Sequence, residues 1–217
     1  MKRDICAIVA VFIAVLSSAQ IKEQHLSHYI FEDFTPGLIF MKNGVVNRGA
    51  LNYNSVTEEM LFKESGKILA IGKDEIERVD TVLIREKKFY PYRGKFLEII
   101  YTKGEKELQV EHKCRVVEPP KTTIFGTTTE TGSSRNYSSV LSNGVLYNLE
   151  IPEGYRIVPY KYYWFRDGKK MSKILNFRQL EKLFKDDKEK YDKYMKENRV
   201  NFNNDREVAA LVKHMLE

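Results

Sequence analysis

Cysteine is scarce in this chain of 217 residues, which has only Cys6 and Cys114. Cys6 lies in an N-terminal segment that we expect to be removed, so Cys114 would remain alone. A single cysteine cannot form an internal disulfide, and packing must therefore stabilise the fold. A lipid-anchored protein would need a cysteine at the cleavage point, where this chain has Gln20 and Ile21. A lipid anchor is therefore disfavoured.

Long apolar runs are absent after the N-terminus. There, two basic residues precede the apolar run Ile5–Leu16, and small residues follow it at 17–19. This order is typical of a secretory signal peptide that is cleaved between Ala19 and Gln20. The alternative is a retained membrane anchor, which is disfavoured because the run is shorter than the roughly twenty residues that span a bilayer. No later segment predicts a transmembrane helix, so we expect a soluble, secreted protein of the periplasm or cell envelope.

A concentrated positive charge is missing as well. The net charge is +6, but the 36 Lys and Arg residues are interspersed with 30 Asp and Glu residues. The densest mixture lies at residues 182–196 and is typical of a solvated helix face. Nucleic-acid binding needs basic residues clustered on one surface, so we expect no nucleic acid among the partners.

Motifs for catalysis or cofactor binding are not recognisable. Gly126 and Gly132 bracket threonines, but no Lys-Ser or Lys-Thr follows, which excludes a phosphate-binding loop. Glu58 and Glu59 point to opposite faces if their segment is a strand, so they cannot act together on one glycosidic bond. We expect no catalytic residues, no metal site and no cofactor.

Three weaker candidates have simpler explanations. His112 and Cys114 share one strand face, as a base and a nucleophile could, but burial in the core explains both because that face is apolar. His25 and His28 could form part of a metal site, yet no third ligand is in view. The Asp-Thr-Val pattern around Thr81 resembles an acceptor for O-linked glycosylation, an interpretation that burial of Thr81 would remove.

Short alternating segments separated by turn residues dominate residues 37–118. Asn43-Gly44 lies between apolar runs, as in a hairpin with a type I′ turn. In Glu107–Val117 the apolar residues share one face, while Gln109 and Glu111 lie on a polar face. We therefore predict an α+β protein. It would be mainly an antiparallel β-meander, as a sandwich or a partly closed, barrel-like sheet, with a C-terminal pair of α-helices.

The C-terminal region combines tyrosine-rich strands with amphipathic helices. Val145–Ile151 and Tyr155–Phe165 predict two strands that pair across a Pro-Glu-Gly turn. Asn176 and Asn204 each precede a Gln or Glu by three residues, a pattern typical of helix N-termini. The two helices would bury these residues at helical spacing: Phe177, Leu180, Phe184, Tyr191, Met195, Val208, Leu211, Val212 and Met215.

The chain thus divides into five parts. Residues 1–19 are the signal peptide, 20–36 a leader, 37–118 the antiparallel β domain, 119–143 a linker, and 144–217 the tyrosine-rich hairpin with two helices. The linker is rich in Ser, Thr and Gly and has no hydrophobic period.

Three motifs carry a resemblance to a known family. They are LNYN followed by a T-x-EM-x-F run at residues 51–62, the segment FGTTTETGSSRNYSS, and the C-terminal stretch KLFKDDKEKYDKYMKENRVNFNNDREVAALVKHM. On these motifs, which cover nearly the whole mature chain, the protein resembles a family of uncharacterised secreted proteins from Bacteroidota. No activity is known for that family, so the resemblance implies export and assigns no functional residue.

Aromatic residues are concentrated around residue 160. Strand alternation places Tyr160, Tyr162 and Trp164 on one face, and Tyr163 and Phe165 on the other. Exposed tyrosine and tryptophan beside lysines suit a protein interface or a platform for sugars, so Tyr160, Tyr162, Tyr163 and Trp164 are candidate binding residues. The alternative is that one face packs on the sheet and the other under the helices.

These observations favour an exported, non-enzymatic protein of the periplasm or cell envelope that binds another protein or a glycan. Two alternatives stay open. A secreted hydrolase of peptide or glycan would need convergent Asp, Glu, His or Ser side chains at a pocket. A structural envelope protein would assemble with copies of itself through its amphipathic helices, and the sequence does not determine the oligomeric state.

Overall fold

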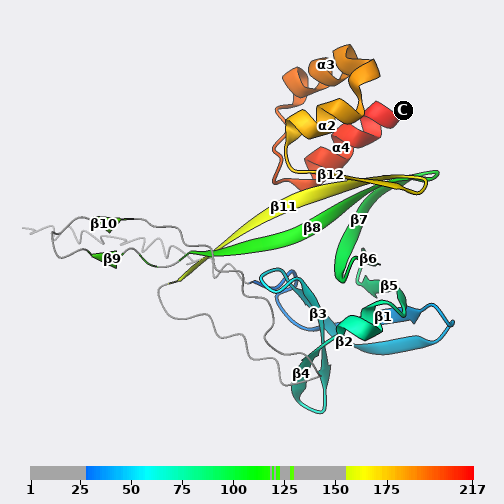
Figure 1. Cartoon of the computed structure of the whole chain (residues 1–217), viewed down its shortest axis with the longest axis vertical. Helices are drawn as coiled ribbons and strands as arrows, with labels where there is room; N and C mark the ends of the chain where they lie inside the picture. Colours follow the sequence, from blue (N-terminus) through cyan, green and yellow to red (C-terminus); the bar gives the residue numbers. More distant parts are fainter. Residues whose placement is uncertain (1–27, 118, 120, 123–127, 130–154) are drawn as a thin grey trace, which may run out of the picture.

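The fold is described by a computed structural model for residues 28–117, 119, 121–122, 128–129 and 155–217 (Figure 1). The predicted signal peptide, most of the predicted linker and the predicted strand Val145–Ile151 lie outside the described residues.

Within the described residues, ten strands form one antiparallel sheet in the order β12-β11-β8-β7-β6-β5-β1-β2-β3-β4. The N-terminal strands are β1 (Thr35–Met41), β2 (Val46–Asn54), β3 (Glu59–Glu64), β4 (Lys67–Ala70), β5 (Val79–Ile84) and β6 (Lys87–Tyr92). The others are β7 (Lys95–Lys103), β8 (Lys106–Val117), β11 (Arg156–Asp167) and β12 (Lys170–Ile174). A separate pair joins β9 (Lys121–Thr122) to β10 (Thr128–Thr129). The predicted α+β class is confirmed, with a sheet that stays open instead of closing into a barrel.

The hairpin predicted at Asn43-Gly44 connects β1 to β2, but its turn is not of type I′. Gly44 has a φ of 87°, whereas Asn43 has no positive φ. The N–H of Gly44 bonds to the carbonyl of Met41, and the N–H of Met41 bonds to the carbonyl of Val45. This is a three-residue loop that ends in a bulge at glycine. The Asn43 side chain accepts the N–H of Val45 at 3.1 Å, which stabilises this turn instead.

The first predicted C-terminal helix is interrupted. It consists of α2 (Phe177–Leu183), the 3-10 turn η1 (Lys185–Asp187) and α3 (Lys188–Asn198), and α4 (Asp205–Leu216) follows. The backbone leaves helical geometry at Phe184, where φ is −115° and ψ is 32°. Both predicted N-caps are confirmed, because the Asn176 and Asn204 side chains accept backbone N–H groups of the first turns of α2 and α4. A single helical turn, α1 (Lys73–Ile76), links β4 to β5.

The described neighbours of the tyrosine-rich strand are β8 and β12; its predicted partner Val145–Ile151 lies outside the described residues, so that pairing stays a prediction. β11 pairs with β8 along its whole length, and its end from Tyr163 to Asp167 also pairs with β12. The sequence analysis missed β12, because its five residues are mostly polar and too few to show a period.

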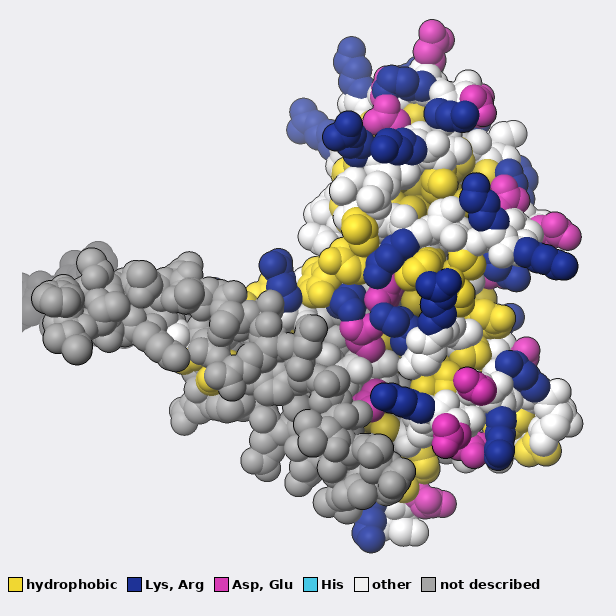
Figure 2. Space-filling view, viewed as in Figure 1, with side chains coloured by type: hydrophobic (Ala, Val, Ile, Leu, Met, Phe, Trp, Pro, Cys, Tyr) yellow, Lys and Arg dark blue, Asp and Glu magenta, His cyan; other side chains and the backbone are white. Residues whose placement is uncertain are grey.

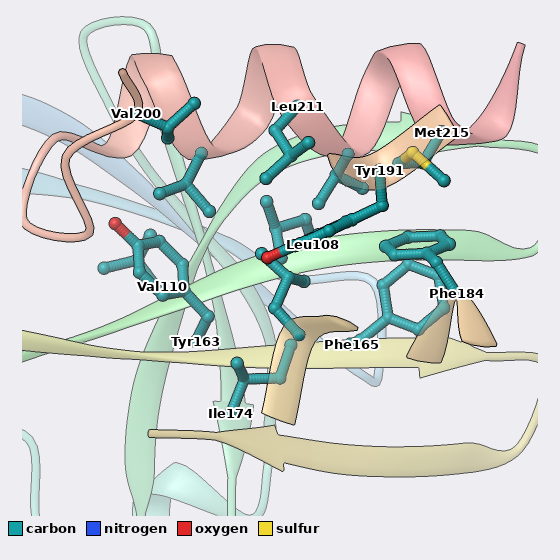
Figure 3. Close-up of a cluster of buried hydrophobic side chains, with 13 residues drawn as sticks. Leu108, Val110, Tyr163, Phe165, Ile174, Phe184, Tyr191, Val200, Leu211 and Met215 are labelled. Atoms are coloured by element: carbon teal, nitrogen blue, oxygen red, sulfur yellow. The ribbon is translucent and has the colours of Figure 1, made fainter. Parts of the chain in front are cut away.

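Two hydrophobic cores lie on the sheet. In the N-terminal half the sheet curls around a core that includes Leu51, Tyr53, Val82, Phe89 and Phe96. At the other end, α2, α3 and α4 cover β8, β11 and β12 (Figure 1). Figure 3 shows the second core, which packs strand residues such as Val110 and Phe165 against Leu211 and Met215 of α4. The curl brings the β2–β3 turn to β8, where the Cys114 N–H donates to the Ser55 carbonyl at 2.9 Å.

Candidate functional site

The four candidate binding residues divide between the two faces of β11. Tyr163 points into the helical core and is fully buried (Figure 3). Its hydroxyl donates to the Phe202 carbonyl at 2.7 Å, and burial raises the pKa of that hydroxyl. Tyr163 is therefore a core residue of the described fold. Tyr160, Tyr162 and Trp164 lie on the opposite, helix-free face and are half-buried.

A buried carboxylate, Glu111 of β8, anchors this helix-free face. Its side chain is 0 % exposed, although it lies on the polar face of its strand. The indole N–H of Trp164 donates to Glu111 at 2.7 Å. The ammonium groups of Lys95 and Lys173 lie 2.6 and 3.0 Å from the Glu111 oxygens. A polar face can be buried here because these side chains cover the carboxylate and neutralise its charge.

The environment of Glu111 holds it ionised. Burial by itself raises the pKa of this carboxyl, but the bonds from Lys95, Trp164 and Lys173 outweigh that effect. The net result is a pKa of about 2. The position of Trp164 and the charge state of Glu111 are thus coupled.

A second carboxylate connects the β2–β3 turn to the same face. Glu58 has a φ of 61°, and this turn geometry directs its side chain toward β7 and β8. Its oxygens form ion pairs with Lys95, at 2.7 Å, and with Lys113. The side chains of Glu58, Lys95 and Lys113 are between 18 and 27 % exposed, so these pairs are shielded from solvent more than ordinary surface ion pairs.

Cations and aromatic rings alternate across the surface above Glu111. We call this set the cation–ring row, and it consists of Arg115, Tyr160, Tyr162, Lys173, Trp164, Tyr92 and Arg93. Arg115 lies over the Tyr160 ring, and Lys173 lies over both Tyr162 and Trp164. The remaining steps are the ring pairs Tyr160–Tyr162 and Tyr92–Trp164 and the stacking of Arg93 on Tyr92. All of these separations lie between 4.6 and 5.4 Å, within the range of favourable cation–π and edge-to-face contacts.

Charged and hydrophobic side chains are also mixed in the space-filling view (Figure 2). Figure 2 shows basic, acidic and hydrophobic side chains side by side over β8 and β11, below the helices. Such a surface combines apolar contact area with fixed charges.

The other candidate of the sequence analysis, the pair His112 and Cys114, does not act as one unit. His112 Nε2 lies 2.6 Å from Glu98, whereas the Cys114 sulfur lies 3.2 Å from the Ser55 hydroxyl. Burial raises the pKa of the Cys114 thiol, so the reactive thiolate is disfavoured. Burial also lowers the pKa of His112, despite the opposing effect of Glu98. Both residues are explained by their place in the fold.

The remaining candidates are resolved in part. Thr81 is 8 % exposed and its hydroxyl donates to Asp80, so the folded chain does not present it for glycosylation. His28 is half-buried, and burial lowers its pKa, while His25 lies outside the described residues. Within the described parts of the chain, no three His, Cys, Asp or Glu side chains are grouped to hold a metal ion. No helix there has the length and apolar character to cross a membrane.

Most of the site was missed by sequence reasoning. Tyr160, Tyr162 and Trp164 were found from their alternation, but Glu111, Tyr92 and the cations were not. Lys95 and Glu111 lie on the β7–β8 hairpin, whereas Trp164 and Lys173 lie on the β11–β12 hairpin, so only the long-range pairing of β8 with β11 places them around one carboxylate.

Comparisons with known proteins add no relative: no family model matches the chain, and neither the curated proteins nor the solved structures contain a match. The class that the structure defines is an α+β protein with an open antiparallel sheet and C-terminal helices.

Proposed function

We propose that this chain is an exported, non-enzymatic binding protein of the periplasm or cell envelope, whose binding surface is the cation–ring row. The single observation that supports a binding role is the row itself, held in place from below by Glu111. Tyr, Trp and Arg are the residue types that dominate binding energy at interfaces. Side chains that are already ordered lose little conformational freedom when a partner binds, which favours affinity.

The test is crosslinking of the exported chain in the envelope of the producing organism. A variant with Tyr162→Ala and Trp164→Ala removes the centre of the row. A Tyr194→Ala variant is the control, because Tyr194 is a half-buried aromatic residue on α3, among the helices. We expect the parent and the control to capture the same component, and the double variant to capture at least about tenfold less, since each lost hot-spot side chain costs more than about 1 kcal/mol.

Thermal melting of each variant, followed by circular dichroism, shows whether it is folded. Equal capture by all three folded proteins would contradict the proposed surface.

A further inference from the structure

The cation–ring row is a linear series of contacts. It begins at Arg115 on β8, crosses β11 and β12, and ends at Arg93 in the β6–β7 turn. Each member contacts the next at about 5 Å, so the row is a continuous series of seven side chains. A globular partner with a specific interface would cover about 800 Å² on each side. A row of this shape fits a linear chain better than a globular surface.

The charges of the row are unbalanced at its two ends. The carboxylates beneath and beside it are all in ion pairs: Glu111 and Glu58 with lysines, and Glu107 with Arg166. Arg93 and Arg115, in contrast, are exposed and form no ion pair within the described residues. Each guanidinium is stacked on a tyrosine ring, which orders it while its N–H groups stay available for a planar anion such as a carboxylate.

The position of the row on a sheet face also restricts the ligand. The backbone groups of β11 beneath it are engaged in the ladder with β8, and near Trp164 also in the ladder with β12. An extended peptide lying over the Tyr163–Asp167 part of β11, where both edges are paired, would find no backbone partners, unlike a peptide that adds to a sheet edge. A polysaccharide needs no such partners, because its sugar rings contact aromatic side chains and its substituents reach the cations.

We propose that the row binds an acidic polysaccharide whose sugar units carry carboxylate groups. Arg93 and Arg115 pair with carboxylates at the two ends, and the rings of Tyr160, Tyr162 and Trp164 contact the sugars between them. This inference rests on the proposed binding function and names the chemical class of its ligand.

The experiment is isothermal titration calorimetry of the exported chain with oligogalacturonate, with neutral dextran oligomers as an uncharged polysaccharide probe. An Arg93→Gln, Arg115→Gln variant removes the two end charges. An Arg178→Gln, Arg206→Gln variant is the control, because it removes the same net charge from exposed positions on α2 and α4. We expect oligogalacturonate to bind the parent and the control, and the end-charge variant to bind at least about tenfold more weakly. Binding should weaken as salt is added, and dextran should not bind.

Three results would overturn the proposal. They are no binding of oligogalacturonate by the parent, equal binding by the end-charge variant and the control, or tighter binding of poly-glutamate or single-stranded DNA than of oligogalacturonate. The first result together with a crosslinked envelope partner that is lost from the Tyr162, Trp164 double variant would leave the proposed function standing with another ligand. Failure of both experiments would overturn both.

Discussion

At the residue scale, Glu111 shows how a charge can be buried in the middle of a sheet. A fully buried carboxylate is tolerated only when it is paired, and here Lys95, Lys173 and Trp164 supply the partners. Removal of one member leaves a buried charge without its partner. The effects of substitutions in this cluster on stability are therefore not additive. The orientation of Trp164 in the cation–ring row depends on this cluster.

The pKa of Glu111 predicts how stability depends on pH. The pKa is about 2 in the folded chain and 4.5 for an ordinary glutamate, so the unfolded chain binds the proton more readily. The stabilisation is fully present above pH 4.5 and is lost as the pH falls from 4.5 toward 2. A Glu111→Gln variant should lose about 3 kcal/mol of unfolding free energy at pH 7, because each pKa unit corresponds to about 1.4 kcal/mol.

Urea unfolding measured between pH 2 and 7 tests this prediction. The stability difference between the parent and Glu111→Gln should shrink through that acid window. Glu197→Gln, an exposed position on α3, is the control and should track the parent. A difference that stays constant with pH would show that Glu111 does not stabilise the fold through its charge.

At the scale of elements, the break between α2 and α3 has a packing role. Phe184 stands at the break, is 7 % exposed, and packs edge-to-face on Phe165 of β11 with ring centroids 6.1 Å apart. The helical spacing of the apolar residues in the sequence predicts one continuous helix over residues 177–198. In the structure α2 ends at Leu183, and the next residue, Phe184, contacts Phe165 of the sheet.

Replacement of Phe184 by Ala should cost about 3 to 5 kcal/mol, the usual range for a phenylalanine removed from a core. The measurement is the free energy of urea unfolding. Leu175→Ala is the control, since Leu175 is 41 % exposed and should change stability by less than about 0.5 kcal/mol. Equal stabilities of the Phe184→Ala variant and the parent would contradict the packing of the helices on β11.

At the scale of the whole molecule, one sheet carries two hydrophobic cores. It also carries a polar cluster of Glu98, His112 and Lys87. Glu98 is 4 % exposed and lies 2.6 Å from both His112 and Lys87. Burial raises the pKa of the Glu98 carboxyl, but these two partners lower it further than burial raises it, so the carboxyl is ionised.

Asp205, the first residue of α4, pairs with Lys161 of β11 at 3.1 Å and joins the helices to the sheet.

Export is a prediction for the whole chain that depends on its first residues. We expect the protein recovered from cells to begin at Gln20 and to fractionate with the periplasm or envelope. Val11→Arg places a charge inside the apolar run and should leave an uncleaved precursor in the cytoplasm. Intact mass spectrometry of each fraction is the measurement. An uncleaved parent chain in the cytoplasm would contradict both the signal peptide and the proposed location.

The sequence analysis was accurate for features that depend on residues close together in the sequence and less accurate for features that depend on long-range contacts. The caps Asn176 and Asn204 and the strand Glu107–Val117 were found, because each depends on residues a few positions apart. The short strand β12 was missed, since it owes its place to pairing with β11 more than to its own residues. Alternation places Tyr163 on the face opposite Tyr160, Tyr162 and Trp164, but it does not tell which of the two faces the helices cover.

By itself, the sequence determined the α+β class, the hairpin at Asn43-Gly44 and the helix N-termini of this protein, because hydrophobic period and turn chemistry act locally. Only the tertiary structure decided that Glu111 is buried and that Arg93 and Arg115 stand at the two ends of one row. The physical reason is that these residues meet across strands paired over long sequence distances. In such a sheet the surroundings of a charge depend on which strands become neighbours, and a local pattern does not contain that information.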